Sequence, residues 1–148
     1  MRVSVIGGST VTDGLSEEAR EVGRLLAERD HEVVCGGHTG VMEAVCRGAV
    51  EAGGHTIGIL PGENREAANP YVTTAIATGL GNARNALVVL NGDAAIAIDG
   101  STGTLSEIAL ALDAGKPVAG IDTHDVAGIE PVETPAAAVE YVERSVEE

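Results

Sequence analysis

The chain has 148 residues, of which 44% are hydrophobic, so it can bury a core and is too apolar for a disordered protein. Its 23 acidic and 9 basic residues give a net charge of −14, which opposes binding to nucleic acids and to anionic membranes. No apolar run reaches the roughly 18 residues that span a bilayer, and the first residues fit a strand better than a signal peptide. We therefore expect a single cytoplasmic domain over residues 1–148.

Short apolar runs alternate with helical patterns along the whole chain. The apolar runs predict strands at residues 2–8, 31–37, 55–62, 72–79, 93–99 and 116–122. The helical patterns predict a helix that begins at Ser16 and further helices at residues 40–54, 81–92, 103–114 and 134–148. Strands without polar alternation are covered on both faces. The chain is therefore expected to form a three-layer, Rossmann-like α/β fold with a doubly wound parallel sheet of about six to seven strands.

Glycine-rich segments follow several of the predicted strands. Ligands bind beyond the carboxyl ends of the strands in open parallel sheets, and glycine lets a backbone approach a ligand closely. We predict that these segments bind the ligand, and that one methionine supports the face of a base where aromatic residues are scarce. The predicted ligand-binding residues are Gly7, Gly8, Ser9, Gly36, Gly37, Gly40 and Met42.

The segment Gly100-Ser101-Thr102-Gly103-Thr104 lies between a predicted strand and a predicted helix. Its glycines expose backbone N–H groups, its hydroxyls add donors, and the helix directs its positive end toward them. We predict that this loop binds a phosphate group through local donors, although the protein as a whole repels anions. The alternative is a strand-to-helix turn in which Ser101 or Thr102 only caps the helix.

Two charged residues are candidates for catalysis. Arg84 is one of few cations and follows the fourth predicted strand, and Glu107 lies one turn into the helix after the phosphate loop. A guanidinium and a carboxylate at one sheet edge can orient a ribose or a water molecule beside a bound phosphate. The alternatives are a surface ion pair for Arg84 and simple complementarity to the helix dipole for Glu107.

The histidine and cysteine positions predict no metal site. The histidines show no HxH or HExxH spacing, and Cys35 and Cys46 are too far apart for a CxxC pair, so we expect two buried, reduced thiols. The chain also lacks a GxSxG elbow, a Walker sequence and a GxGxxG after its first strand, which disfavours P-loop NTPases and ordinary dehydrogenases. The acidic excess, with Lys116 as the only lysine, is typical of a halophilic source, and an ordinary acidic protein is the alternative.

The segments CGGHTGVMEAV (35–45) and GSTGTLSE (100–107) resemble the LOG-type, lysine decarboxylase-like Rossmann proteins, whose signature pairs GGGxxGLM with PGGxGTxxE. Four residues match the second motif, whereas Asp99 and Ser101 replace its proline and its second glycine. The segment TGLGNARNALVV (78–89) is similar to a short, uncharacterised subgroup related to molybdenum cofactor carrier proteins and, more distantly, to the DNA-processing protein DprA. The four residues that match the motif PGGxGTxxE are Gly100, Gly103, Thr104 and Glu107.

This resemblance implies three possible functions. The first, which we favour, is a binding module for a phosphorylated nucleotide or pterin-type ligand, with the molybdenum cofactor as carried ligand and no cofactor required. The second is a nucleoside 5′-monophosphate phosphoribohydrolase that cleaves an N-glycosidic bond with Arg84 and Glu107. The third is a DprA-like DNA-binding module, which the charge disfavours. The resemblance also implies a homo-oligomer, a dimer or tetramer, and the apolar helices at 81–91 and 103–114 could form its interface.

Overall fold

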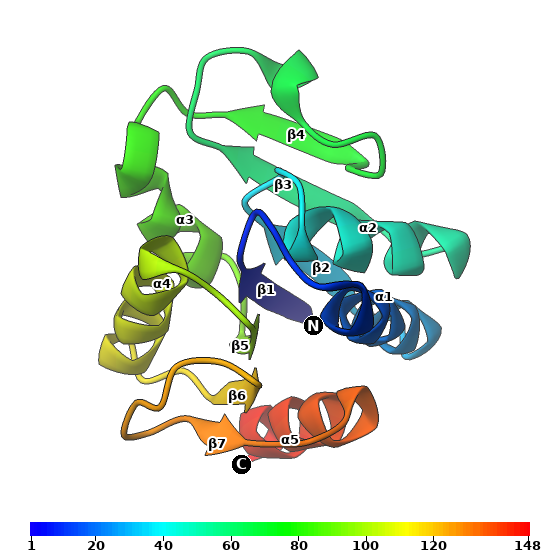
Figure 1. Ribbon diagram of the computed structural model, residues 1–148, viewed down its shortest axis with the longest axis vertical. Helices are drawn as coiled ribbons and strands as arrows, with labels where there is room; N and C mark the ends of the chain where they lie inside the picture. The colour runs from blue at the N-terminus through cyan, green and yellow to red at the C-terminus, as the bar shows by residue number, and fades with distance from the viewer.

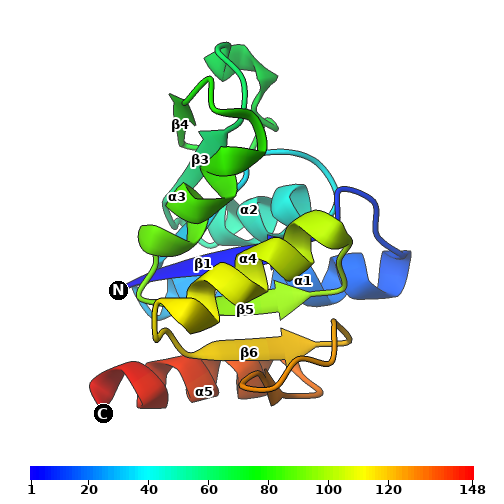
Figure 2. The same ribbon diagram turned by 90° about the vertical axis from the view of Figure 1, so that its left-hand side faces the viewer.

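The computed structural model describes residues 1–148 and contains a seven-stranded sheet between two layers of helices (Figures 1 and 2). All paired strands are parallel, and their order is β4-β3-β2-β1-β5-β6-β7. The predicted three-layer, Rossmann-like fold is therefore confirmed. The strands are β1 (Arg2–Gly7), β2 (Glu32–Cys35), β3 (Thr56–Leu60), β4 (Thr74–Ala77), β5 (Ala94–Ile98), β6 (Val118–Ile121) and β7 (Glu130–Pro131).

Three helices cover one face of the sheet and two cover the other (Figure 1). The first group is α1 (Asp13–Glu28), α2 (Val41–Glu51) and α5 (Pro135–Glu147). The second group is α3 (Arg84–Leu90) and α4 (Thr102–Asp113). None of these helices combines the length and the apolar composition needed to cross a membrane.

The start of α1 differs from the prediction. The helix begins at Asp13 because Thr12, rather than Ser16, is its N-cap: the Leu15 N–H donates to Thr12 Oγ1 at 3.4 Å. Ser16 lies inside the first turn, where its N–H donates to the Thr12 carbonyl at 2.9 Å. The helix is capped by a hydroxyl side chain, as predicted, but the residue is Thr12, one turn before Ser16.

Three further segments differ in detail from the prediction. The segment at 63–71, which joins two predicted strands, contains a short 3₁₀ turn, η1 (Arg65–Ala67), and the predicted helix at 81–92 divides into a second turn, η2 (Gly81–Ala83), and α3. Strand β7 was not predicted because both of its residues are exposed and it pairs only at the sheet edge. Such a strand leaves no apolar run in the sequence.

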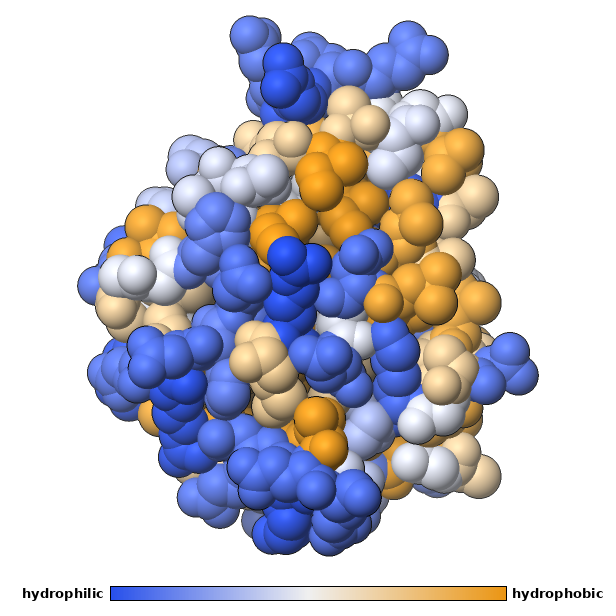
Figure 3. All heavy atoms as spheres, turned by 180° about the vertical axis from the view of Figure 1, so that it is seen from behind, coloured by the Kyte–Doolittle hydropathy of each residue, from blue (hydrophilic) through white to orange (hydrophobic).

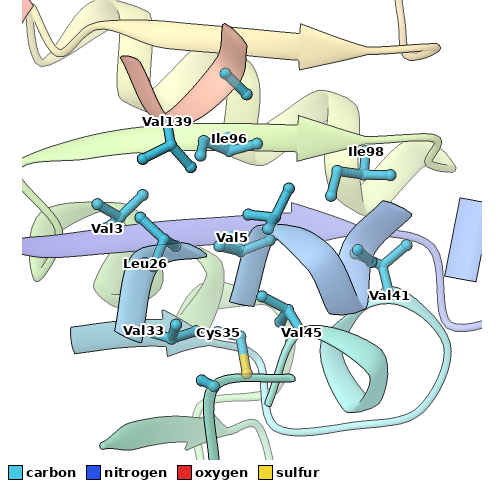
Figure 4. Packing of buried hydrophobic residues seen from close by; sticks show 14 of the residues in the cluster. Val3, Val5, Leu26, Val33, Cys35, Val41, Val45, Ile96, Ile98 and Val139 are labelled. Atoms are coloured by element: carbon cyan, nitrogen blue, oxygen red, sulfur yellow. The ribbon is translucent and has the colours of Figure 1, made fainter. Parts of the chain in front are cut away.

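The core is aliphatic and is larger on the side of α1, α2 and α5. Twenty-two buried residues form one cluster there, in which Val5 and Ile96 of the sheet face Leu26 of α1 and Val139 of α5 (Figure 4). Seven buried residues form the main cluster beneath α3 and α4. Both faces of the central strands are thus dry, as the continuous apolar runs predicted.

The sheet reverses its winding between β1 and β5. From β1 the chain proceeds outward to β4 and then returns to place β5 on the other side of β1, with Gly7 paired to Ile98. The helices that follow these two strands, α1 and α4, lie on opposite faces of the sheet, so their connections diverge at the carboxyl edge (Figure 2). Doubly wound proteins bind their ligands at this kind of divergence.

Helices α1 and α2 approach each other through two glycines. A Cβ added at Gly23 would lie 2.0 Å from the Val45 carbonyl oxygen, and one added at Gly48 would lie 1.9 Å from the Arg20 carbonyl oxygen. Both contacts are with backbone, which cannot rotate away. These glycines therefore set the separation of two helices that cover the same sheet face.

Replacing Gly23 by alanine is expected to destabilise the protein by more than about 2 kcal/mol, because the two helices must separate. Gly14→Ala in the same helix is the control, since an added Cβ there meets nothing within 4 Å. That variant should gain up to about 1 kcal/mol from helix propensity. Chemical denaturation measures both, and equal effects of the two substitutions would contradict the close packing.

Candidate functional site

The loops that follow β1 and β2 are joined at the carboxyl edge of the sheet. The Val41 N–H donates to the Gly8 carbonyl at 3.0 Å, and the Thr39 hydroxyl donates to the Ser9 carbonyl at 2.9 Å. Gly40 has φ +68°, and a Cβ there would lie 2.3 Å from the Gly8 oxygen, so only glycine fits. The structure thereby brings Gly8, Ser9 and Gly40 together, as the sequence predicted.

The predicted phosphate loop lies next to these two loops, after β5. A Cβ added at Gly8 would be 3.8 Å from Gly100 Cα, so the two backbones are neighbours. Gly100 has φ +132°, and the Ser101 N–H donates to Thr104 Oγ1 at 3.4 Å. The N–H groups of Thr102 and Gly103 begin α4 and have no backbone acceptor. The loop therefore caps the helix and still leaves donors for an anion.

A hollow of about 700 Å³ opens beside the phosphate loop, between the N-terminal ends of α3 and α4. Its volume lies within the range of small-molecule sites. Arg84 and Glu107 are not among the residues that line it. Its lining residues are Asn82, Ala83, Asn85, Ala86, Thr102, Gly103, Ser106 and Leu110.

Residues from the loop after β6 hold the phosphate loop from the other side. The Thr123 hydroxyl donates to the Asp99 carbonyl at 2.5 Å, and His124 Nε2 lies 2.9 Å from the Ser101 carbonyl oxygen. Because a carbonyl only accepts, Nε2 must carry the proton in this contact. Asp99 itself has φ +53°, which places this residue in the left-handed region at the mouth of the loop.

Arg84 extends from the start of α3 over the loop that follows β2. Its Nη2 donates to the Gly36 carbonyl at 3.4 Å, and a Cβ at Gly36 would lie 2.8 Å from the same nitrogen. Gly36 thus provides the space that Arg84 occupies. Burial lowers the pKa of Arg84, the charge of Glu107 partly offsets this, and the guanidinium stays protonated.

Arg84 does not form the surface ion pair that was the alternative to a role in the site. It forms no ion pair with a carboxylate, and its buried Nε has no hydrogen-bond partner. Its positive charge also contributes, after burial, to lowering the pKa of His38. The arginines that do pair with glutamates on the surface are Arg2, Arg20, Arg24, Arg29 and Arg47.

Glu107 lies on α4 with only 6% of its surface exposed. Burial raises the pKa of its carboxyl from the ordinary 4.5 to about 7, and the positive charge of Arg84 opposes this rise. No hydrogen bond to the carboxyl compensates for its burial. A buried carboxyl that titrates near neutral pH beside a fixed cation can accept or donate a proton, which complementarity to a helix dipole would not require.

Two buried asparagines organise the site and were not predicted. Asn69 donates from Nδ2 to the His38 carbonyl at 2.8 Å and so fixes the loop after β2. Asn85 lies beside Arg84 and connects it to Ser106 of α4. The only signal in the sequence was that asparagines stand close to an apolar or glycine-rich segment, and this is too common to indicate a site.

The other predicted ligand-binding residues shape the backbone. A Cβ at Gly7 would lie 2.4 Å from the Ile98 carbonyl oxygen, and Gly37 has φ +79°. Met42 belongs to the large core cluster and is only 8% exposed, which leaves little of its side chain for a base. These positions allow the loops to converge and contribute few groups that could touch a ligand.

The cysteines and the single lysine have structural environments. Cys35 and Cys46 are fully buried and unbridged, with 3.5 Å between their sulfurs, and the neighbouring thiol together with burial raises the pKa of Cys35. Lys116 Nζ donates to three carbonyls at the end of α3, at 2.8, 3.0 and 2.5 Å. A lysine that caps a helix in this way is not available for a Schiff base.

Sequence comparison relates almost the whole chain to one family. A family model described as the SLOG cluster4 family matches residues 1–147. An uncharacterized protein of Archaeoglobus fulgidus is 41% identical over 142 residues, covering 95% of this chain and 93% of that protein. A probable cytokinin riboside 5′-monophosphate phosphoribohydrolase of Oryza sativa subsp. japonica is 34% identical over 112 residues, covering 72% of this chain and 46% of the rice protein.

Structural comparison points to the same group of proteins. The molybdenum cofactor binding protein of Rippkaea orientalis is 35% identical with a TM-score of 0.89, over 98% of this chain and 95% of that one. The Moco carrier protein of Chlamydomonas reinhardtii is 30% identical with a TM-score of 0.89, over 99% and 97%. DprA of Streptococcus pneumoniae shares the fold, with 17% identity and a TM-score of 0.76 over 95% of this chain and 61% of that one.

The buried carboxyl of Glu107 is expected to make stability depend on pH. Below pH 4.5 it is protonated in both the folded and the unfolded chain, and as pH rises through about 7 the folded protein must bury a charge. Glu107→Gln removes this cost, which is at most roughly 3 kcal/mol, and should raise the Tm at pH 8 by several degrees but not at pH 4.

Thermal unfolding at the two pH values measures this difference. Glu66→Gln is the matched control, because that side chain is exposed. A Glu107→Gln effect of equal size at pH 4 and pH 8 would contradict the account.

Proposed function

Because this chain belongs to the SLOG cluster4 family, we propose that it binds a phosphorylated nucleotide or pterin-type ligand at the carboxyl edge of its sheet. The phosphate group would be held by the loop at residues 100–104. The observation that supports this most is the pair of free N–H groups, of Thr102 and Gly103, at the start of α4. The molecule carries a charge of −14, so such local donors must supply most of the attraction.

The molybdenum cofactor is the ligand we favour. Two of the similar structures are described as a molybdenum cofactor binding protein and a Moco carrier protein, at 35% and 30% identity. The cofactor is a pterin that bears a phosphate group, which suits the donors of the loop. The protein would then carry or store this ligand as cargo, without a resident cofactor of its own.

Hydrolysis of a nucleoside 5′-monophosphate is the second candidate function, and Glu107 favours it. With a pKa of about 7, its carboxyl is partly ionised at neutral pH. The ionised form could stabilise the positive charge that develops on a ribose as the N-glycosidic bond breaks, or could orient the attacking water. Arg84 would hold the phosphate or the departing base. The rice relative is named for this reaction, although the aligned region covers only 46% of it.

A DNA-binding role has the least support. DprA is similar at only 17% identity, so the likeness concerns the fold. Five of the arginines are paired with glutamates on the surface, which leaves no basic stripe for a phosphate backbone.

An assay of retained ligand and of hydrolysis separates the first two functions. We expect protein purified in high KCl to retain a phosphorylated pterin or nucleotide, detected by mass spectrometry after denaturation. We also expect no release of free base from AMP. Release of adenine that is lost in Glu107→Gln and Arg84→Ala, but kept in the surface control Arg47→Ala, would overturn the carrier proposal and establish the hydrolase.

We also propose that the protein assembles through α3 and α4. Leu90, Leu105 and Leu110 of these helices are 59%, 40% and 38% exposed. In Figure 3, apolar residues gather along the right-hand side, where α3 and α4 lie in this view. A face of this kind is typical of an interface between copies of a chain.

Light scattering at molar salt should give the mass of a dimer or tetramer. Leu110→Glu should lower this mass toward that of one chain, because it places a charge in the apolar face. Val50→Glu is the control, since Val50 is 40% exposed but lies on α2, on the other face of the sheet. A monomer mass for the unaltered protein would contradict the assembly.

A further inference from the structure

A chain of hydrogen bonds runs from Arg84 to the phosphate loop. Arg84 Nη1 donates to Asn85 Oδ1, and Asn85 Nδ2 donates to Ser106 Oγ at 3.2 Å. The Ser106 hydroxyl donates to the Gly103 carbonyl at 2.7 Å. Asn85 is 7% exposed, so water competes little for its amide. We call Asn85 and Ser106 the relay.

The direction of each bond in this chain is determined by the groups that form it. The guanidinium only donates, so the oxygen of the Asn85 amide must face Arg84 and its nitrogen must face Ser106. An amide nitrogen also only donates, so Ser106 Oγ accepts there, and its own proton is available for the Gly103 carbonyl. All three bonds therefore have the same polarity, from the cation toward the loop.

The last carbonyl in the chain belongs to the peptide unit that also contains the Thr104 N–H. Thr104 lies in the first turn of α4, and in the capping box its N–H donates to the Ser101 hydroxyl oxygen, whose own proton remains available for a further acceptor. A hydrogen bond to the carbonyl of a peptide makes the N–H of that peptide a stronger donor, because bonds in series polarise one another. The polarised Thr104 N–H in turn makes the Ser101 O–H a stronger donor, so every dipole of the chain has its positive end toward an anion bound at this loop.

We propose that Asn85 and Ser106 are positioning residues that couple the charge of Arg84 to the anion site. This inference rests on the proposed binding of a phosphate group at residues 100–104. The relay orients the Gly103–Thr104 peptide and extends the influence of the buried guanidinium to a loop that Arg84 does not contact. In a molecule of charge −14, it is one of few local sources of positive potential at this edge.

Three substitutions test the direction of the relay. Ser106→Ala removes the donor to Gly103, and the exposure of this residue makes the change compatible with folding. Ser106→Thr restores a hydroxyl at the same position. Asn85→Asp keeps the shape of the side chain but can no longer donate to Ser106, so the hydroxyl proton turns toward the new carboxylate and the chain loses its polarity.

The experiment is a titration of the full-length protein with inorganic sulfate, followed by the amide resonances of residues 102–104. Sulfate keeps its charge between pH 5 and 9, so the probe itself does not titrate. We expect Ser106→Ala to weaken sulfate binding about fivefold, the net worth of one hydrogen bond. Asn85→Asp should weaken it at least as much, and Ser106→Thr should bind like the unaltered protein.

The Thr104 amide proton of the ligand-free protein gives a second readout that a purely structural role would not change. Its resonance should move upfield in Ser106→Ala and Asn85→Asp and return in Ser106→Thr, at unchanged Tm. If sulfate binds at residues 102–104 equally in all four proteins, the relay is overturned and the phosphate site stands. If the unaltered protein shows no sulfate-dependent shift at these residues, both proposals are overturned.

Discussion

The proposed site would have to attract an anion to a molecule that repels anions. A net charge of −14 gives long-range electrostatics the wrong sign for a phosphate ligand, so attraction must come from groups in direct contact. The structure concentrates two kinds of such groups at one edge of the sheet. The first turn of α4 presents N–H groups without backbone acceptors, and Arg84 is an arginine whose charge no carboxylate neutralises by contact. The arginines that do form ion pairs with glutamates lie on the outer surface.

These anion-binding groups can gather at one edge of the sheet because the fold brings the backbones of neighbouring loops close together. The winding of the sheet reverses between β1 and β5, so the connections that follow these strands diverge at the carboxyl edge. Small residues allow the loops to contact one another there. Gly40 approaches the Gly8 carbonyl, and Gly36 leaves the space that the guanidinium of Arg84 fills. The same packing buries Glu107, so its carboxyl gains a pKa of about 7 from its surroundings and not from a specific partner. A single arrangement thus supplies both anion donors and a group that changes charge near neutral pH.

Much of the fold and part of the site could be predicted from the sequence, because their signals are local. Continuous apolar runs located the central strands, and the segment around Gly100 carried its own turn and helix start. The contributions of Asn69, Asn85 and His124 could not be predicted, because their partners lie 31, 21 and 23 residues away in the chain and meet only after the sheet has formed. Strand β7 was not predicted because its residues are exposed. Met42 was predicted to contact a ligand, whereas helix α2 directs its side chain into the core. The family resemblance pointed to these loops as the candidate site, but it could not distinguish a carrier from a hydrolase, since both would use the same loop, arginine and glutamate.

The most direct measurement of the central claim is a crystal structure of the protein soaked with a nucleoside monophosphate. The account predicts phosphate density within hydrogen-bond distance of the Thr102 and Gly103 N–H groups, on the side of the loop that the start of α4 faces. Density for the phosphate elsewhere on the molecule, with the turn at residues 100–104 left empty, would contradict it.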